Sequence, residues 1–400
     1  ALTFGAFFPS LLVQYPQTMF AEPAAKPPLP LHSNATALYN SFRYAALVQC
    51  GKENTGTGKK SGRRRRLCSA VGEQEKTLPN LANGNISGNG RRPERRNAVL
   101  DVCLLGTGGM MPMPNRFLSS MLLRLRGRMV LVDCGEGTQV SLKLLGWGFK
   151  AIDAICFTHY HADHISGLPG MLLTIGNSGR TEPLKLYGPP GLREVVEGLL
   201  RIAGGIPFPI EYYELRDTKK TYSIAGLTMN FLPVNHSVPC VAYRFLVERQ
   251  GKFDAGAATA LGLPKNLWSV LQKEGRVTYE GREYLAEQVI GPARPGIRLA
   301  YCTDSRPVKA LPEFVGPADL FVCEGIYGDD AKRDKAVGYK HMLFSEAAKL
   351  ASRAGARRMW LTHYSPSMSD PQEFLHNATR YFEHTELGHD RITTQLAFPE

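Results

Sequence analysis

The segment Phe157-Thr158-His159-Tyr160-His161-Ala162-Asp163-His164 decides the fold of this 400-residue chain. It continues the apolar run Ala151–Thr158, which is typical of a fully buried strand. Because side chains alternate along an extended strand end, His159 and His161 point to one face, and the loop then turns the following Asp-His pair toward a neighbouring point. Imidazoles and a carboxylate at two adjacent points are the ligands that two zinc-type ions need. A chance His-rich turn is the alternative, and four metal-capable residues within six positions argue against it.

Three further metal-capable residues each end a predicted strand, and they are His236, Asp304 and His363. Any one of them alone is more often a hydrogen-bonded structural residue. Because all three lie at carboxyl ends of strands, their side chains can converge in a crevice and complete a ligand set for two ions. Four histidines lack this placement and are predicted to lie in a leader or on the surface: His32, His376, His384 and His389.

The composition indicates a soluble globular protein. With 43% hydrophobic and 21% charged residues, a disordered chain, a collagen-like fibre and a disulfide-rich miniprotein are excluded. No run of about 18 uncharged apolar residues is present, so no membrane span is predicted. The eight cysteines are scattered without C-x-x-C pairs, which favours reduced thiols and a cytoplasmic location.

The net charge of +12 is unevenly distributed along the chain. Residues 1–98 hold 14 Lys/Arg against 5 Asp/Glu, or +9, and residues 99–400 hold 34 against 31, or +3. Residues 1–97 are Pro-rich at Pro23–Pro30 and carry a four-arginine run at Arg63–Arg66. We therefore predict a disordered leader over 1–97 and an ordered domain over 98–400, whose partners must be inferred from its chemistry and not from its charge.

Short apolar runs that end in turn residues predict the strands of the domain, at Val99–Leu105, Met121–Arg126, Arg128–Asp133, Ala151–Thr158, Pro183–Tyr187, Gly226–Val234, Val241–Val247, Arg298–Thr303, Leu320–Cys323 and Arg358–Thr362. Helices are predicted at Gly137–Leu145, Gly191–Ala203, Phe344–Ala354 and Pro371–Phe382. Since strand mostly follows strand, two sheets covered by outer helices fit better than one parallel sheet with a helix after every strand. A polar, Gly/Pro-punctuated insert between Arg249 and Gly296 is expected to project from the body.

These residues resemble the metallo-β-lactamase fold, through His159-x-His161-x-Asp163-His164, and within it the ribonuclease Z family of tRNA 3′-processing endonucleases. The likeness covers about residues 99–400. Further segments carry it: Leu105-Gly106-Thr107-Gly108, Asp133-Cys134-Gly135-Glu136-Gly137-Thr138-Gln139, His164-Ile165-Ser166-Gly167-Leu168-Pro169-Gly170, Thr181-Glu182-Pro183-Leu184 with Tyr187-Gly188-Pro189, and Thr303-Asp304-Ser305-Arg306-Pro307. The resemblance implies an α/β domain of four layers (αββα), with two mixed sheets between helices and an arm insert at about 250–296.

The resemblance also implies a site with two Zn²⁺ ions per subunit. One ion would take His159, His161 and His236, the other Asp163, His164 and His363, and Asp304 would bridge them. The family's later catalytic histidine matches His341 in Tyr339-Lys340-His341-Met342.

Hydrolysis of a phosphodiester at neutral pH needs an activated water and a proton for the leaving ribose oxygen. His341 is the candidate proton donor, Glu324 can orient it, and Asp163 can orient the water. Many members of the family read His-Glu-Ala-Thr where this chain reads Cys323-Glu324-Gly325-Ile326, so only the glutamate of that box is kept. Asp133 and Glu136 are expected either to shape a Gly-rich turn or to support the metal ligands.

The function implied by the resemblance is removal of 3′ trailers from precursor tRNA by a homodimeric, metal-dependent endoribonuclease. The substrate-binding candidates are Lys252, Phe253, Lys265, Trp268 and Arg306. The arm carries six basic against five acidic residues, so its charge alone does not predict RNA binding.

Two other function classes fit the same scaffold. A small-molecule phosphodiesterase or lactonase would use the same metal chemistry, and the arm is the feature that separates it from a tRNA nuclease. A catalytically inactive binding protein is disfavoured because no metal position is missing.

Overall fold

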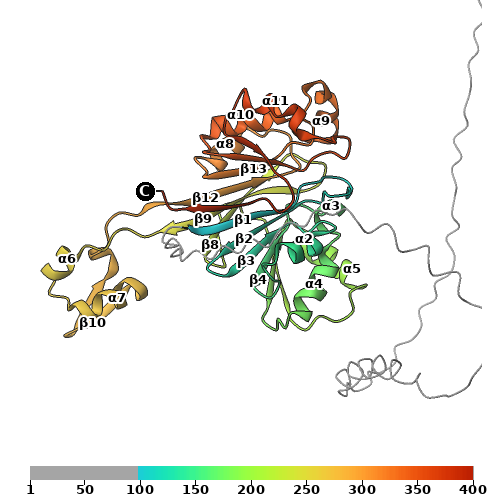
Figure 1. The fold of residues 1–400 in the computed structure, drawn as a ribbon. Coiled ribbons are helices and arrows are strands. Elements are labelled where there is room, and N and C mark those ends of the chain that lie inside the picture. The colour runs from blue at the N-terminus through green and yellow to red at the C-terminus, as the bar shows by residue number, and fades with distance from the viewer. Residues whose placement is uncertain (1–97, 400) are drawn as a thin grey trace, which may run out of the picture. The chain divides into compact units, whose positions relative to one another are not determined.

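Two seven-stranded β-sheets form the body of the protein in the computed structural model, which describes residues 98–399 (Figure 1). The first sheet has the order β16-β1-β2-β3-β4-β5-β6 and the second the order β15-β14-β13-β12-β9-β8-β7. The strands of the first sheet are β1 (Ala98–Gly106), β2 (Ser120–Leu125), β3 (Arg128–Val132), β4 (Ile152–Cys156), β5 (Leu184–Gly188), β6 (Ile210–Glu214) and β16 (Thr393–Ala397). Those of the second are β7 (Tyr222–Ile224), β8 (Leu227–Val234), β9 (Cys240–Arg249), β12 (Arg294–Cys302), β13 (Leu320–Glu324), β14 (Met359–Thr362) and β15 (Thr385–Leu387).

Helices cover the outer face of each sheet, which gives four layers. Those on the first sheet are α2 (Thr138–Leu145), α4 (Leu168–Asn177) and α5 (Leu192–Leu200), and those on the second are α8 (Leu311–Val315), α10 (Phe344–Ala354) and α11 (His376–Thr379). The remaining short helices of the body are α3 (Ala162–Ile165), η2 (Asp330–Lys332), α9 (Arg333–Tyr339) and η3 (Pro371–Phe374). The predicted αββα fold is therefore confirmed.

Strand β1 contributes side chains to two apolar layers, one on each of its faces. Leu100, Val102 and Leu104 point into the cluster between the sheets, whereas Cys103 and Leu105 join the cluster beneath the helices of the first sheet. All five are at most 1% exposed, and each large apolar side chain so buried stabilises the fold by roughly 1.5–3 kcal/mol. Both faces of the strand are apolar because both are covered.

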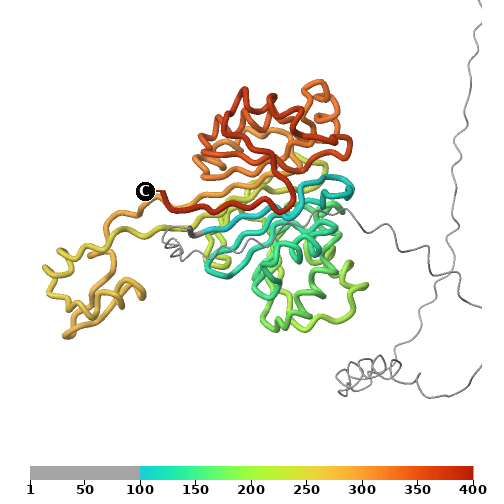
Figure 2. The backbone as a smooth tube through the Cα atoms, viewed as in Figure 1, coloured from blue at the N-terminus to red at the C-terminus, as the bar shows by residue number. Residues whose placement is uncertain are grey.

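The insert forms a small unit of its own between β9 and β12, at the lower left in Figure 2. Its elements are α6 (Ala255–Ala260), α7 (Lys265–Glu274), β10 (Arg276–Tyr279), β11 (Arg282–Leu285) and η1 (Ala286–Gln288). β10 and β11 pair with each other and not with the body sheets. A separate apolar cluster, built on Ala258, Leu263, Leu271, Tyr284 and Val289, holds these elements together. We call residues 250–293 the arm.

Most predicted elements agree with the structure to within one or two residues, and the differences are local. The predicted helix Pro371–Phe382 is wrong, because it is broken into η3 and α11; Asn377 and Thr379, which have low helix propensity, lie in its second half. Helix α4 was not predicted. None of the helices described between residues 98 and 399 is long and apolar enough to cross a bilayer. The predicted leader lies outside the described residues.

Candidate metal centre

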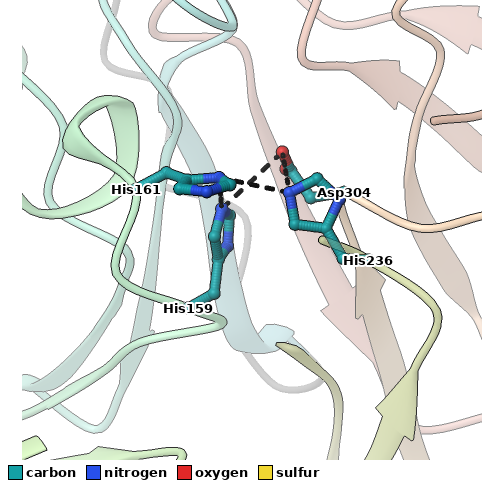
Figure 3. Close-up of side chains that lie close together, drawn as sticks. All are labelled: His159, His161, His236 and Asp304. Atoms are coloured by element: carbon teal, nitrogen blue, oxygen red, sulfur yellow. Dashed lines mark hydrogen bonds and ion pairs between the residues drawn. The ribbon is translucent and has the colours of Figure 1, made fainter. Parts of the chain in front are cut away.

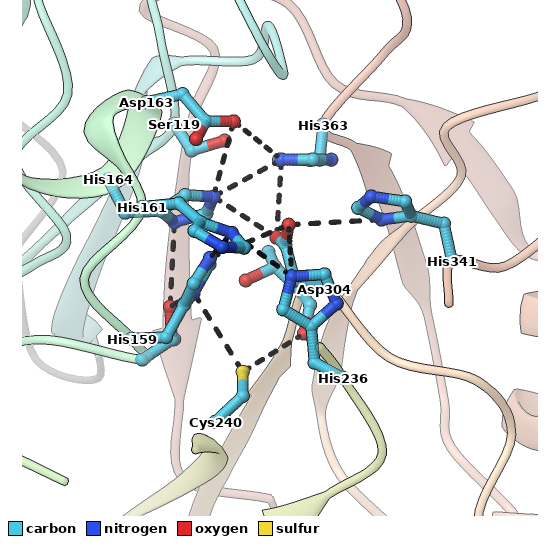
Figure 4. Close-up of polar contacts among 12 residues, drawn as sticks. Ser119, His159, His161, Asp163, His164, His236, Cys240, Asp304, His341 and His363 are labelled. Carbon is cyan, nitrogen blue, oxygen red and sulfur yellow. Dashed lines mark hydrogen bonds and ion pairs between the residues drawn. The ribbon is translucent and has the colours of Figure 1, made fainter. Parts of the chain in front are cut away.

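Seven predicted metal ligands follow the carboxyl ends of four strands and meet where the two sheets come together (Figure 4). β4 supplies His159, His161, Asp163 and His164; β8 supplies His236; β12 supplies Asp304; and β14 supplies His363. The apolar strands end at the edge of the buried layers, so each polar side chain lies just beyond the core.

The first group contains three imidazoles and one carboxylate oxygen (Figure 3). His161 Nδ1 lies 3.0 Å from His159 Nε2 and 3.1 Å from His236 Nε2. Asp304 Oδ2 lies 3.8 Å from the Nε2 atoms of both His159 and His236. Three ring nitrogens and one carboxylate oxygen therefore surround one point.

The second group shares the same aspartate. His363 Nε2 lies 3.2 Å from His164 Nε2 and 3.3 Å from Asp163 Oδ2. Asp304 Oδ1 lies 3.1 Å from His164 Nε2 and 3.2 Å from His363 Nε2. The two oxygens of Asp304 thus face the two groups separately, which is the geometry of a bridging ligand.

The chemistry of this donor set fits metal ions. Within residues 98–399, the buried Asp304 Oδ1 and His363 Nδ1 lack a hydrogen-bond partner, although buried polar groups nearly always have one. Burial and the neighbouring His164 hold the pKa of His159 well below its usual value, so its ring is neutral and can offer a lone pair. Despite burial, the surrounding imidazoles hold the pKa of Asp304 well below its ordinary range. A neutral imidazole and an ionised carboxylate are suitable ligands for a divalent cation. Despite burial, the neighbouring aspartates raise the pKa of His164 well above its ordinary value, so this ring must release its proton to bind a cation.

Asp133 supports the ligands directly, which was one of two roles expected for it. His164 Nδ1 lies 2.9 Å from Asp133 Oδ2, and the backbone N–H of Thr158 donates to Asp133 Oδ1 at 2.8 Å. This contact fixes the ring of His164 so that Nε2 faces the second group. Glu136 is exposed and has no such contact with a ligand in the described part of the chain.

The glycine run after β1 brings backbone close to the centre. A Cβ on Gly109 would lie 2.5 Å from the ring of His363, so a side chain there would displace that ligand. The next residue, Met110, has a φ of 69° and donates its backbone N–H to Asp163 Oδ2 at 2.7 Å. Neither contact was predicted, although the Gly-rich motif indicates a close backbone approach.

His341 and Glu324 form a buried pair beside the metal ligands. His341 Nδ1 lies 3.0 Å from Glu324 Oε2 and 3.8 Å from Asp304 Oδ2, and His341 is only 8% exposed. Burial lowers the pKa of His341, but the carboxylate of Glu324 outweighs it and raises that pKa to about 9. At neutral pH the ring therefore carries a proton. Cys323, which replaces the family's histidine, packs in the apolar cluster under α10 and leaves this pair intact.

Lys340 links the metal ligands to His341 and was not predicted. Its Nζ donates to the carbonyl oxygen of His236 at 3.0 Å, and its own carbonyl oxygen accepts from His236 Nδ1 at 3.4 Å. Its backbone is left-handed, with φ 59°. A lysine that precedes a histidine in the sequence does not indicate that the lysine forms these two hydrogen bonds.

The five predicted substrate-binding residues do not lie together. Arg306 pairs with Glu346 and donates to the carbonyl oxygen of His341, so it fixes the His341 loop. In the arm, Phe253 and Trp268 pack against each other with ring centroids 5.2 Å apart, and the Trp268 indole N–H donates to Leu263. Their packing belongs to the core of the arm. The other two candidates, Lys252 and Lys265, are exposed on the arm.

Two family models match parts of the chain. The model described as anti-Pycsar protein Apyc1 matches residues 100–252, and the β-lactamase superfamily domain matches residues 267–364. Among solved structures, the short form of human tRNase Z is 24% identical with a TM-score of 0.54, and YhfI of Bacillus subtilis is 19% identical with a TM-score of 0.54. Each match covers 75% of this chain and 100% of the other chain. These likenesses establish the metallo-β-lactamase fold.

Curated relatives give a closer match. Ribonuclease Z of Clostridium acetobutylicum is 50% identical over 300 residues, which is 73% of this chain and 97% of that protein. Ribonuclease Z of Lachnospira eligens is 50% identical over 302 residues, covering 76% of this chain and 99% of that protein. Identity at this level over nearly the whole length of these relatives, together with the fold and the clustered histidines and aspartates, shows that the chain belongs to the ribonuclease Z family.

Proposed function

We propose that this protein is a metal-dependent endoribonuclease that removes 3′ trailers from precursor tRNA. The observation that carries the proposal is the shared position of Asp304 between two groups of ligands, with the protonated His341 beside it. Two adjacent cations and a proton donor are what phosphodiester hydrolysis requires. Relatives named ribonuclease Z, at 50% identity, support RNA as the substrate.

We infer that the ions are two Zn²⁺ per subunit. A donor set of five imidazoles and two carboxylates suits zinc better than magnesium or calcium, which prefer oxygen ligands. His159, His161 and His236 would hold one ion and Asp163, His164 and His363 the other, with Asp304 as the shared ligand. When bound, the ions would lower the pKa of a water and neutralise charge on the phosphoryl oxygens.

The side chains of the protein supply the proton chemistry. Asp163, held by the backbone of Met110, accepts a hydrogen bond from the attacking water and orients it toward phosphorus. The water, having released one proton to solvent, bonds to phosphorus through its oxygen, the P–O bond to the leaving ribose breaks, and His341 gives its proton to that ribose oxygen. Glu324, whose other oxygen accepts from the backbone of Ser305, holds the ring and keeps it protonated.

The direct test maps the cut. Purified protein is incubated with a 3′-extended tRNA precursor and the ends of the products are sequenced, and metal content is measured on the same sample. Cleavage just after the discriminator base, with two equivalents of zinc, supports the proposal. Hydrolysis of small phosphodiesters without cleavage of the precursor would instead support a small-molecule phosphodiesterase.

We propose a homodimer in which the arm of one chain serves the metal centre of the other. In β9 and β12 the arm joins one end of each strand, and the ligands His236 and Asp304 lie near the other. The ten residues from Arg294 to Asp304 span about 33 Å when extended, so an arm that leaves at the far end faces away from its own centre. In a dimer, the arm of one chain can instead reach the metal centre of the other chain.

The outer face of the first sheet offers an apolar surface for such a dimer. On α2, Val140 and Leu144 are 54% and 64% exposed, and on the neighbouring α4, Leu173 is 39% exposed. Exposed apolar side chains that cluster on adjacent helices are typical of subunit contacts. Light scattering should give a dimer that Leu144→Glu weakens, whereas Leu285→Glu on the arm should leave it unchanged.

Complementation tests the arrangement in trans. A chain with residues 251–295 replaced by a short Gly/Ser linker keeps its metal centre, and a chain with Asp304→Asn keeps its arm. Each alone should cleave precursor poorly, and a mixture that exchanges subunits should regain activity. No gain in the mixture would refute the arrangement in trans.

A further inference from the structure

A pocket of about 490 Å³ lies at the base of the arm. Its walls come from the ends of β9 and β12 that join the arm, which we call the legs, and from the rest of the body. Arg249, Arg294 and Arg298 come from the legs, and Pro317, Asp319 and Arg357 from the rest of the body. The seven residues from Ile297, also in its wall, to Asp304 span about 23 Å along β12, so the pocket is remote from the metal centre. Its volume lies within the range of small-molecule sites, roughly 300–1,000 Å³.

The acidic groups of this arginine pocket are already engaged. Asp319 Oδ2 accepts the backbone N–H of Arg298 at 2.8 Å, and Asp319 Oδ1 lies 3.1 Å from Arg357 Nη1. Glu248 accepts from the hydroxyl of Thr228 at 2.9 Å. Four arginines therefore share the pocket with two carboxylates, of which Asp319 pairs with one of the four, Arg357, and Glu248 accepts from Thr228.

Three of the arginines have no counter-charge in the described chain. No carboxylate of residues 98–399 lies within 4.0 Å of the guanidinium of Arg249, Arg294 or Arg298. Arg249 donates to the carbonyl oxygen of Pro399 at 2.6 Å and Arg294 to that of Gln250 at 2.9 Å, and these neutral acceptors do not compensate their charge within residues 98–399. All three are half-buried, where an unpaired charge is costly.

A phosphate group matches this pocket. Guanidinium groups present several N–H donors in a fixed plane and bind phosphate oxygens in pairs, with charge-assisted bonds stronger than those to a carbonyl. The half-buried Arg298 also faces a like charge, because after burial it is the neighbour that lowers the pKa of Arg244. A bound anion would compensate Arg249, Arg294 and Arg298 together.

We propose that the arginine pocket binds a phosphate group, carried either by a free nucleotide or by the backbone of RNA bound along the arm. Binding of an RNA phosphate rests on the proposed function, whereas binding of a free nucleotide does not. The register of β9 with β12 shifts between Arg294 and Ile297, which marks the point where the legs leave the sheet. A phosphate held by both legs and the body fixes the arm at this point.

Binding is tested on the full-length, metal-loaded protein with ATP and with inorganic phosphate, by calorimetry at constant ionic strength. Because the metal centre also attracts phosphate, its occupancy is followed separately as competitive inhibition of nitrophenyl phosphodiester hydrolysis. Arg294→Gln and Arg298→Gln should lower the affinity of the pocket for inorganic phosphate at least tenfold and leave that inhibition unchanged. Lys273→Gln, which removes one exposed charge from the arm, should change both by less than twofold.

A second measurement distinguishes the sources. If RNA supplies the phosphate, ATP does not bind at the pocket, and each arginine variant weakens binding of precursor tRNA. The number of ions released when the precursor binds should then fall by about one for each phosphate that the variant no longer contacts. If a nucleotide supplies it, ATP binds and the affinity for precursor is unchanged when ATP is absent. Unchanged affinity of the folded variants for both ATP and precursor would overturn the proposal, and so would equal effects of Lys273→Gln. If ATP binds at the pocket, the proposal of a phosphate site is supported even when the protein does not cut the precursor.

Discussion

Replacing Glu324 with glutamine should move the basic limb of RNA cleavage to lower pH. The Glu324 carboxylate is the largest cause that raises the pKa of His341 to about 9, against the opposing effect of burial. A glutamine can still accept from the Ser305 backbone with its oxygen, which leaves its amide to donate to His341 Nδ1 and so to favour the neutral ring. The pKa should then fall to its ordinary value of about 6.5 or below.

The size of the effect follows from the protonated fraction of His341. A group whose folded pKa is raised is protonated below that pKa, so the proton donor is present at neutral pH and disappears as the pH rises through about 9. With a pKa of about 6.5, roughly a quarter of the rings are protonated at pH 7 and about 3% at pH 8. The rate should therefore drop at least about fourfold at pH 7 and about 30-fold at pH 8.

The assay compares two leaving groups. Single-turnover cleavage of precursor tRNA needs a proton on the ribose oxygen, whereas a nitrophenolate leaves without one. Glu324→Gln should therefore slow RNA cleavage in this pH-dependent way and leave hydrolysis of a nitrophenyl phosphodiester within a few fold of wild type. His341→Ala should remove the basic limb for RNA altogether. Equal losses on both substrates, or an unmoved basic limb, would refute the assignment of His341 as the proton donor.

Three further changes test other parts of the molecule. Asp304→Asn should lower the affinity for both ions by at least about tenfold, because one carboxylate serves both groups; elemental analysis after dialysis that finds one ion fully retained would contradict bridging. Lys340→Met and Lys340→Gly should both lower the affinity for the ion held by His236, which is measured by competition with a chelator. Lys340→Gly should be the more stable of the two by about 1 kcal/mol in denaturant unfolding, because position 340 is left-handed and glycine adopts this conformation without strain. A chain that begins near Ala98 should keep its metal content and cleavage position, and loss of either would place the domain boundary earlier.

The sequence predicted the layers and the cluster of histidines and aspartates because both depend on local patterns. Apolar runs such as Ala151–Thr158 mark strands that are buried on both faces, and a polar residue at the end of such a run must lie where the sheet meets solvent. His236, Asp304 and His363 could be predicted in this way before any three-dimensional contact was known. The grouping of the ligands around Asp304 follows from the order of strands in two sheets, which periodicity does not encode.

The supporting contacts were harder to predict because they depend on unusual backbone conformations. Met110, Asp133 and Lys340 have positive φ values between 59° and 69°, and so, at 50° and 61°, do Asp304 and His363, whose positions were predicted but whose backbone conformation was not. Such a conformation is uncommon for residues other than glycine and costs about 1–2 kcal/mol. Each of these residues contacts the centre or belongs to it, so tertiary contacts offset the local cost. A single sequence does not show where this happens.

The pairing of strands in the second sheet holds the geometry of the metal centre independently of the arm. β9 and β12 pair with each other and are flanked by β8 and β13, so both are interior strands and their ends at the centre are fixed on two sides. Their pairing continues to Arg294 and Arg249, with a single shift just before the arm begins. The backbone that carries His236 and Asp304 is therefore held by the sheet independently of the arm. Changes in the arm should alter the KM for precursor tRNA, whereas the kcat for a small phosphodiester depends on the far end of the same two strands.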